Sequence, residues 1–265
     1  MTKTAVVALG GNALTMVPGQ PLAPSDRLRG PGTAAALVTH VTVDPADPAF
    51  GSPSKPIGPF FPAAQARQLA AARGWVVKPD SGRGHRRVVA SPEPTGVVEI
   101  DALRALVDAG RLVITAGGGG IPVADTPDGW VRVDAVIDKD RAAALIARLL
   151  GAQALLLVTA VDRVMLDYGT PRQSELGTIS AADAARHLAN GQFPPGSMGP
   201  KVQAALRFLD SGGELAVITS PGLLAASLAG DPHGGTRIEQ CPSGPGRGQD
   251  AGHRTVLAMP ARRNA

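Results

Sequence analysis

The sequence predicts an α/β protein with a mostly parallel central sheet and helices on both of its faces. Short apolar or β-branched runs alternate along the chain with Ala- and Leu-rich segments of helical periodicity. This alternation is typical of parallel strands joined by helices. With 265 residues, 44% of them hydrophobic, the chain can bury a large core. Gly110 and Gly151 follow two of the helical segments, at positions where helices commonly end.

The individual elements follow from hydrophobic periodicity and from start and stop residues. A continuous apolar run near the N-terminus indicates a buried first strand, and Ser180 with Asp183 forms an S-x-x-D helix start. Strands are expected at residues 4–9, 35–43, 75–78, 87–90, 112–115, 130–133, 155–159 and 215–219. Helices are expected at residues 63–73, 100–109, 136–150, 180–190, 197–211 and 223–229.

Residues 1–240 are expected to form a single domain. Within it, residues 16–33 are rich in Pro, Gly and Ser, carry no periodic pattern, and are expected to be an irregular connector. Residues 78–94 are Gly- and Arg-rich and predict a surface β-excursion or lid. Residues 241–265 are expected to be a Gly/Pro/Arg-rich C-terminal tail outside the domain.

The basic charge of the chain is concentrated in that tail. The sequence pI is about 9.7 and the formal net charge is +4. Residues 241–265 hold four arginines and one acidic residue, so residues 1–240 carry a net charge of only +1. A nucleic-acid-binding domain has its basic patch on the folded surface, and only 3% of the chain is aromatic. We therefore expect a solvated tail and no nucleic-acid partner.

No segment is predicted to cross a membrane. The longest apolar stretch, residues 142–161, is interrupted by Arg148 and Gly151 and falls short of the ~20 apolar residues that a membrane helix needs. The N-terminal apolar run breaks at Gly10, which favours a strand over a signal peptide. The single cysteine, Cys241, fits a reducing compartment, and a cytoplasmic location is expected.

Three glycine-rich elements mark places where an anion could bind. Ligands of α/β sheets bind beyond the carboxyl ends of strands, and glycines let backbone N–H groups approach an anion. Neither a Walker loop nor a dinucleotide-binding fingerprint is present. The three elements are Gly10-Gly11-Asn12 after the first strand, Gly117-Gly118-Gly119-Gly120 after residues 112–115, and Gly196-Ser197-Met198-Gly199-Pro200-Lys201 at a helix start.

Lysine is rare, and its few positions are therefore informative. The chain has five lysines against 21 arginines. Three of the lysines stand in distinctive contexts, namely SKPIG (Lys55), IDKD (Lys139) and SMGPK (Lys201). A compact ammonium on a flexible stem suits a phosphoryl group in transfer. These three lysines are the candidate catalytic cations.

Two acidic residues, Asp138 and Asp140, flank Lys139 at the start of an expected helix. Acidic residues in a first turn commonly serve the helix dipole, and that is one interpretation. The other is that Asp140 holds active-site lysines in position while Asp138 faces a nucleotide or a metal. The five histidines show no metal-ligand spacing, so no protein metal site is predicted.

Seven motifs, in order along the chain, resemble those of carbamate kinases, which are members of the amino acid kinase family. They cover most of residues 43–238 in addition to the N-terminal strand. The motifs are VVALGGNAL (6–14), VDPADPAF (43–50), SKPIGPFF (54–61), RRVVASPEP (86–94), ITAGGGGIPV (114–123), AVIDKDRAAAL (135–145) and GQFPPGSMGPKVQAALRF (191–208).

The resemblance implies the amino acid kinase fold, a three-layer αβα sandwich, in a homodimer. It implies the reaction of ADP and carbamoyl phosphate to give ATP and carbamate, with Mg²⁺. By position, Lys55, Lys139 and Lys201 would neutralise the transferred phosphoryl group and Asp140 would orient them. Phosphate contacts would come from Gly10, Gly11, Asn12, Gly117 and Gly118, and nucleotide contacts from Asp138, Asp162, Ser197, Met198 and Gly199.

The chain also departs from the family pattern. Between Leu14 and Val43 it lacks a strand and the H-G-N-G-P-Q-V-G element that lines the small-substrate site in carbamate kinases, so the sheet is expected to be reduced. In TAVDRVML (159–166), Ala160 replaces an acidic residue and Arg163 a glycine. Two alternatives to a carbamate kinase therefore stay open: a catalytically impaired nucleotide-binding or regulatory homologue, and a kinase with an altered small acceptor.

Overall fold

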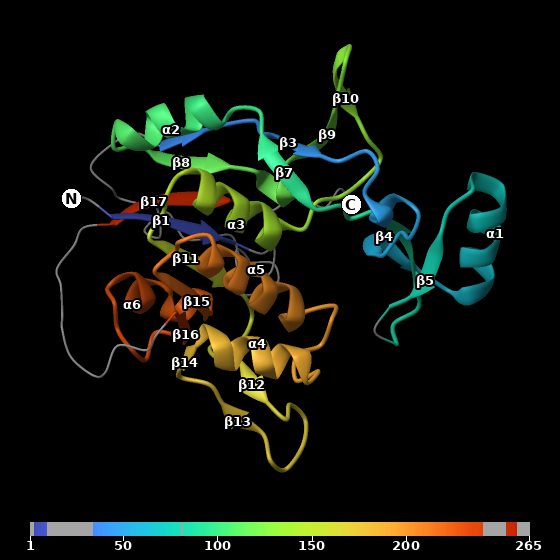
Figure 1. Cartoon of the computed structure of the whole chain (residues 1–265). Coiled ribbons are helices and arrows are strands. Elements are labelled where there is room, and N and C mark those ends of the chain that lie inside the picture. The colour runs from blue at the N-terminus through green and yellow to red at the C-terminus, as the bar shows by residue number, and fades with distance from the viewer. Residues whose placement is uncertain (1–2, 10–33, 81, 241–252, 259–265) are drawn as a thin grey trace.

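In the computed structural model, which describes residues 3–9, 34–80, 82–240 and 253–258, an eight-stranded sheet forms the centre of the molecule (Figure 1). Neighbouring strands run parallel, apart from the antiparallel pair β15 and β16. The predicted mostly parallel sheet is confirmed. The strand order is β14 (Thr178–Ser180), β16 (Thr236–Glu239), β15 (Leu215–Thr219), β11 (Ala154–Val158), β1 (Lys3–Ala8), β17 (His253–Ala258), β8 (Leu112–Thr115) and β2 (Ala34–Ala36).

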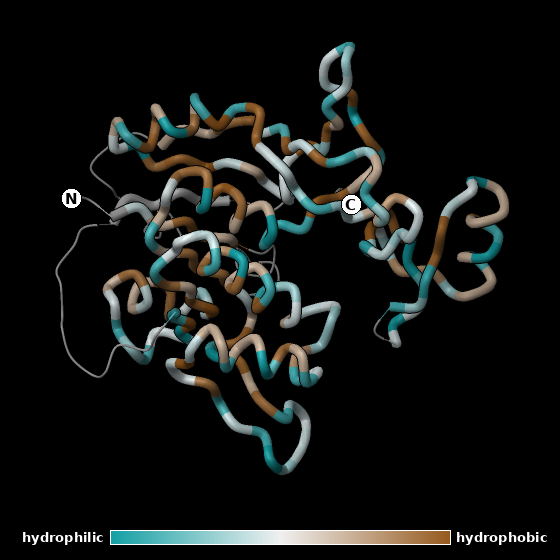
Figure 2. Tube along the Cα trace, viewed as in Figure 1, coloured by the Kyte–Doolittle hydropathy of each residue, from teal (hydrophilic) through white to brown (hydrophobic). Residues whose placement is uncertain are grey.

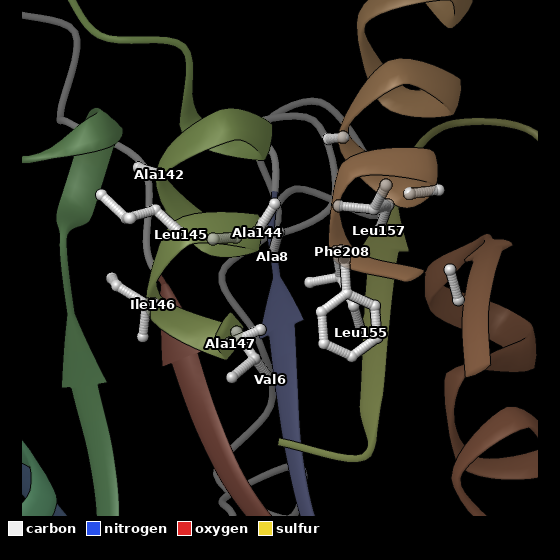
Figure 3. Packing of buried hydrophobic residues seen from close by; sticks show 14 of the residues in the cluster. Val6, Ala8, Ala142, Ala144, Leu145, Ile146, Ala147, Leu155, Leu157 and Phe208 are labelled. Carbon is white, nitrogen blue, oxygen red and sulfur yellow. The ribbon is translucent and has the colours of Figure 1, made fainter. Parts of the chain in front are cut away.

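Helices pack on both faces of this sheet because its central strands are apolar on both sides. In β1, Val6 and Ala8 pack on one face with Leu155 and Leu157 of β11 (Figure 3). Ala5 and Val7 point to the opposite face, as the period of two in a strand requires. The first face is covered by α2 (Ile100–Asp108), α3 (Lys139–Leu149), α4 (Ala181–Ala189) and α5 (Met198–Asp210), and the second by α6 (Leu224–Leu228).

Smaller sheets lie outside the central sheet (Figure 1). One pairs β3 (His40–Val43) with β7 (Pro94–Val97) and β9 (Ile121–Thr126), and β9 with β10 (Gly129–Arg132). A short hairpin pairs β12 (Met165–Leu166) with β13 (Ser174–Glu175). The described residues also include the 3₁₀ turns η3 (Pro48–Phe50), η4 (Gly117–Gly119) and η5 (Pro221–Leu223).

A separate lobe stands at the right of Figure 1. It consists of β4 (Lys55–Phe61), α1 (Ala63–Arg73), β5 (Val77–Pro79) and β6 (His85–Val89). The buried residue of α1 is Ala66. Hydrophilic residues are frequent along this lobe, whereas apolar residues concentrate in the central sheet (Figure 2). No helix in the described ranges combines the length and the apolar character that crossing a bilayer requires.

The expected strand at residues 35–43 is wrong as a single element. Its first part is β2, which pairs with β8, and its last part is β3, which pairs with β9. Between them the chain leaves the central sheet, and the Thr39 hydroxyl bonds the Leu37 carbonyl at 3.0 Å and contacts the Thr115 hydroxyl at 2.6 Å. The helix expected from residue 136 begins at Lys139, because Asp138 caps it. The connector at residues 16–33 lies outside the described residues.

Part of the expected tail lies inside the sheet. Residues 253–258 form β17, which pairs along six residues with β1 and along three with β8. Both neighbours run parallel to it, so β17 is a central strand and not a solvated extension. The domain boundary expected at residue 240 is therefore misplaced for this segment. The sequence alone did not reveal strand β17, because a run of six residues after a Gly- and Pro-rich stretch carries little periodic signal.

Removing residues 241–265 should destabilise the protein strongly. Without β17, strands β1 and β8 would each lose a hydrogen-bonded neighbour in the middle of the sheet, and buried unpaired backbone groups are costly. The expected loss is on the order of 5 kcal/mol, measured as the free energy of unfolding in urea. The matched control removes residues 259–265 alone, which follow the strand. Equal stability of the two truncated proteins would contradict a structural role for β17.

Candidate functional site

A pocket of about 540 Å³ opens where the N-termini of α3 and α5 meet residues that follow β8 and β11. Gly118 follows β8, and Thr159 follows β11. These are carboxyl ends of parallel strands, where α/β sheets bind their ligands. The pocket is lined by Lys55, Gly118, Val136, Ile137, Asp138, Lys139, Asp140, Thr159, Val161, Arg163, Met165, Tyr168, Phe193, Pro194, Gly196, Ser197, Met198, Pro200 and Lys201.

Asp138 joins the lobe to α3. Its carboxylate caps the helix by accepting from the Asp140 N–H at 2.9 Å, and its second oxygen binds the Lys55 ammonium at the start of β4. Burial would raise the pKa of Asp138, but the Lys55 ammonium and the backbone N–H of Asp140 outweigh burial and lower this pKa to about 2. Asp138 therefore remains ionised throughout the physiological range.

Asp140 joins α3 to α5. Its side chain is 5% exposed, and its two oxygens bind the Lys139 ammonium at 2.5 Å and the Lys201 ammonium at 2.7 Å. Burial lowers the pKa of Lys139, attraction to Asp140 opposes this, and repulsion from Lys201 lowers it further. Around the pocket, three ammonium groups thus face two carboxylates. These five groups carry one positive charge in excess, and Arg163 also lines the pocket, so the pocket suits an anionic ligand.

The glycine turn η4 forms another wall of the pocket. Ala116, which precedes it, has a φ of +48°, and its N–H donates to the Thr39 hydroxyl at 3.0 Å. A side chain on Gly119 would be excluded, because its Cβ would lie 2.2 Å from the carbonyl oxygen of Ile137. Gly118 lines the pocket, and Gly117 belongs to the same turn. A glycine is therefore required at position 119, where the turn approaches Ile137, just before α3.

Part of the pocket lining is apolar and aromatic. Met165 and Tyr168 come from the β12–β13 hairpin, and Phe193 precedes the start of α5. Sequence reasoning missed these residues because a lone methionine or aromatic is usually part of a core. The sequence did hold one signal, because turn-forming residues flank Tyr168, and in the structure this residue is 69% exposed.

The structure brings most of the predicted site residues together. The catalytic candidates Lys55, Lys139, Lys201 and Asp140 all line the pocket, as do Asp138, Ser197, Met198 and Gly118. Gly199 is buried in the first turn of α5, where it packs against the Pro194 carbonyl. Asp162 lies between the lining residues Val161 and Arg163 but does not line the pocket itself. Gly10, Gly11 and Asn12 lie outside the described residues.

No cluster of three or more potential metal ligands exists in the described part of the chain. The two carboxylates of the pocket are already bound by lysines.

Replacing Asp138 by Asn should flatten the acid dependence of stability. Because the pKa of Asp138 is about 2 in the fold against an ordinary 3.8, its carboxylate contributes stability that is fully present above pH 3.8 and is lost as the pH falls toward 2. The shift corresponds to about 2 kcal/mol. Asn keeps the helix cap and loses the ion pair with Lys55.

The measurement is urea unfolding at about pH 6 and about pH 2.5, between which the wild type should lose about 1–2 kcal/mol more than Asp138→Asn. Asp101→Asn is the control, because the Asp101 side chain is 93% exposed, and it should behave as the wild type does. If Asp138→Asn and the wild type lost the same free energy of unfolding between the two pH values, the Asp138 carboxylate would have no stabilising role.

Comparisons with known proteins identify relatives of this chain. The chain is 48% identical over 200 residues to the carbamate kinase-like protein YahI of Escherichia coli K12, and 46% identical over 203 residues to a carbamate kinase of Clostridium perfringens. These matches cover 75% and 76% of this chain. They span 63% and 64% of the two relatives, so the chain matches less than two thirds of their length.

Solved structures give the same result. The carbamate kinase of Giardia lamblia bound to AMP-PNP aligns with a TM-score of 0.71 at 38% identity, over 80% of this chain and 66% of that one. A protein of Aeropyrum pernix K1 aligns with a TM-score of 0.77 at 30% identity, over 90% of this chain and 100% of that one. The sequence model of the amino acid kinase family matches residues 62–220, more than half of the chain. On this match and on the shared α/β fold, the chain belongs to the amino acid kinase family.

Proposed function

We propose that the protein is a carbamate kinase-type phosphotransferase, which converts ADP and carbamoyl phosphate to ATP and carbamate. The observation that carries the proposal is the convergence of Lys55, Lys139 and Lys201 on two buried carboxylates in one pocket. Its similarity to curated carbamate kinases supports the same reaction.

The lining of the pocket suits both parts of a nucleotide. The side chains of Met165, Tyr168 and Phe193 suit a base, and the three lysines suit phosphates. Ser197 and Met198 stand at the N-terminus of α5, where backbone N–H groups and the helix dipole favour an anion. The volume of about 540 Å³ is within the range of small-molecule sites.

Each charged residue has a distinct proposed role. Lys139 and Lys201, both held by Asp140, stabilise the charge of the transferred phosphoryl group, and Lys55 approaches it from the lobe. Asp140 and Asp138 are positioning residues, because their carboxylates are engaged by lysines. Such a site needs no covalent intermediate: the protein aligns donor and acceptor and stabilises developing charge. Gly10, Gly11 and Asn12 are proposed to add phosphate contacts.

Mg²⁺ is proposed to enter as part of the nucleotide substrate. Magnesium is commonly bound through substrate phosphates with few protein carboxylates, and both carboxylates of this pocket are neutralised by lysines. A homodimer and a cytoplasmic location are proposed from the family resemblance and from the single cysteine.

The missing segment between Leu14 and Val43 favours a reduced rate. Carbamate is too small to compensate for lost contacts with binding energy from remote groups. The two alternatives are a nucleotide-binding homologue with impaired catalysis and a kinase with an altered small acceptor, and the similarity to curated carbamate kinases favours neither of them.

The decisive experiment measures ATP formation from MgADP and carbamoyl phosphate in a coupled assay, together with ADP binding by calorimetry. We expect that the protein binds ADP. We expect that it forms ATP at a rate well below that of a full-length relative. Lys139→Ala should abolish the turnover, because it removes a charge worth several kcal/mol of barrier. ADP binding without turnover would favour the impaired homologue, and the absence of both would reject the proposal.

Lys201→Ala should weaken ADP binding strongly. The Lys201 side chain is 12% exposed and lines the pocket, whereas Asp140 keeps its second partner, Lys139, in the variant. The matched control is Lys78→Ala, because Lys78 is on the lobe and bonds the Pro53 carbonyl outside the pocket. Calorimetry should show at least a tenfold loss of affinity for Lys201→Ala and none for Lys78→Ala. If Lys201→Ala bound ADP with unchanged affinity, Lys201 would not be part of the ADP site.

A further inference from the structure

A second, smaller cavity of about 150 Å³ lies between α3, the start of β7 and the last turn of α5. It shares no lining residue with the larger pocket. Three arginines and one acidic residue line it, which gives two positive charges in excess. We call it the arginine cavity. It is lined by Glu93, Pro94, Arg141, Ala144, Leu145, Arg148, Arg207 and Ser211.

The three arginines reach this cavity from two helices. Arg141 and Arg148 are seven residues apart on α3, which is about two turns, so they lie on the same side of that helix. Arg207 comes from the last turn of α5, which packs against α3. The convergence therefore depends on how the two helices pack, and no local sequence pattern predicts it.

Binding to helix carbonyls does not explain these arginines. A basic side chain near the end of a helix commonly binds its last carbonyls, and both Arg148 and Arg207 lie in last turns. Here backbone N–H groups already bind such carbonyls. The Leu150 N–H donates to the Ile146 carbonyl at 2.9 Å, and the Ser211 N–H donates to the Arg207 carbonyl at 3.1 Å. The two guanidinium groups thus remain available to another acceptor.

Glu93 is the single carboxylate of the arginine cavity, and two arginines share it. One Glu93 oxygen pairs with Arg207, and the other lies 3.3 Å from Arg141. Arg148 forms no ion pair within the part of the chain that the structure describes. One carboxylate therefore neutralises one of three guanidinium groups and leaves the rest of the positive charge uncompensated.

Arg141 has poorly satisfied hydrogen-bond donors. Its side chain is only 26% exposed, and its Nη1 lies 3.4 Å from the Ser91 carbonyl and 3.3 Å from Glu93. Both distances exceed the usual range of about 2.7–3.2 Å. Its buried Nε has no partner among the described residues, although buried donors in proteins are nearly always paired. This guanidinium therefore favours an additional acceptor in the cavity.

We propose that the arginine cavity binds a dianionic phosphate group, either as free phosphate or as a small phosphate monoester. Guanidinium groups match phosphate oxygens in pairs, and a dianion balances the two excess positive charges. The volume of about 150 Å³ lies below the range of about 300–1,000 Å³ that drug-sized ligands occupy, so the ligand is small. Glu93 competes with the phosphate for Arg141 and Arg207.

Calorimetry with inorganic phosphate tests this site, at constant ionic strength and at a pH where phosphate is a dianion. Phosphate also suits the lysines of the larger pocket, so each variant is combined with Lys201→Ala, which by itself should retain binding at the arginine cavity. Adding Arg148→Gln should weaken this binding about tenfold, because it removes the unpaired guanidinium. Arg67→Gln is the matched control, since Arg67 is exposed on α1, and it should have no effect.

Glu93→Gln tests the competition and has the opposite expected sign. Gln keeps the size of the side chain and removes its charge, so phosphate should bind several-fold more tightly. Asp101→Asn is the control for the lost negative charge, because the Asp101 side chain is 93% exposed. Thermal unfolding without phosphate checks that each variant is folded. If Glu93 served only to hold the helices together, Glu93→Gln would lower the unfolding temperature without tightening phosphate binding.

The ligands compared identify the source of the phosphate group. Tighter binding of glycerol 3-phosphate than of phosphate would assign a monoester, and the reverse order would assign free phosphate. Tighter binding of malonate than of either would overturn the assignment to phosphate. The site itself is rejected if Arg148→Gln leaves phosphate binding unchanged, or if Lys201→Ala alone abolishes it.

Discussion

Two buried carboxylates at the start of α3 organise this site. Asp138 binds Lys55 from the lobe, and Asp140 binds Lys139 from its own helix and Lys201 from α5. A buried charge that loses its partner is strongly destabilising, so each lysine has one favourable place. The lobe, α3 and α5 are therefore aligned by the same interactions that gather the positive charge. One network of ion pairs therefore aligns these elements and gathers the lysines at the pocket.

Strained backbone occurs where two walls of the pocket are formed. Ala116 and Asp167 are the non-glycine residues with positive φ in the described ranges, and each precedes a pocket-lining residue, Gly118 and Tyr168 respectively. Each is held by a side chain from a distant part of the chain, Ala116 by Thr39 and Asp167 by Gln192. Residues in such conformations commonly cluster at functional sites. The pocket is thus preformed by contacts that do not depend on a ligand.

The central sheet places these walls at one edge. Strands β8 and β11 run in the same direction within this sheet, so the pocket residues that follow them, Gly118 and Thr159, lie at the same edge. β17 is the strand that makes the sheet continuous between β1 and β8, and it comes from the far end of the sequence. The glycine turn after β8 therefore depends on a strand that is distant from it in the sequence. Long-range pairing of this kind decides where the pocket walls lie.

Local pattern alone determined a large part of this protein. The apolar runs of β1, β8, β11 and β15 and the capped helices α3 and α4 were predictable, because hydrophobic periodicity and capping act over a few residues. The rarity of lysine drew attention to Lys55, Lys139 and Lys201, and family resemblance assigned them a common site. Local sequence patterns could not predict that Lys55 pairs with Asp138 and Lys201 with Asp140, because these partners lie 83 and 61 residues apart in the chain.

Tertiary structure decided the rest. The split of residues 35–43 between two sheets, the place of β17, and the aromatic lining of the pocket depend on which segments become neighbours. Hydrogen-bonding partners across a sheet carry no signal in the sequence of either strand taken alone. Tyr168 lines the pocket, and the backbone N–H of the residue before it, Asp167, bonds Gln192, which lies 25 residues from Asp167. The sequence determined which residues can fold locally and carry charge, and long-range packing determined which of them meet.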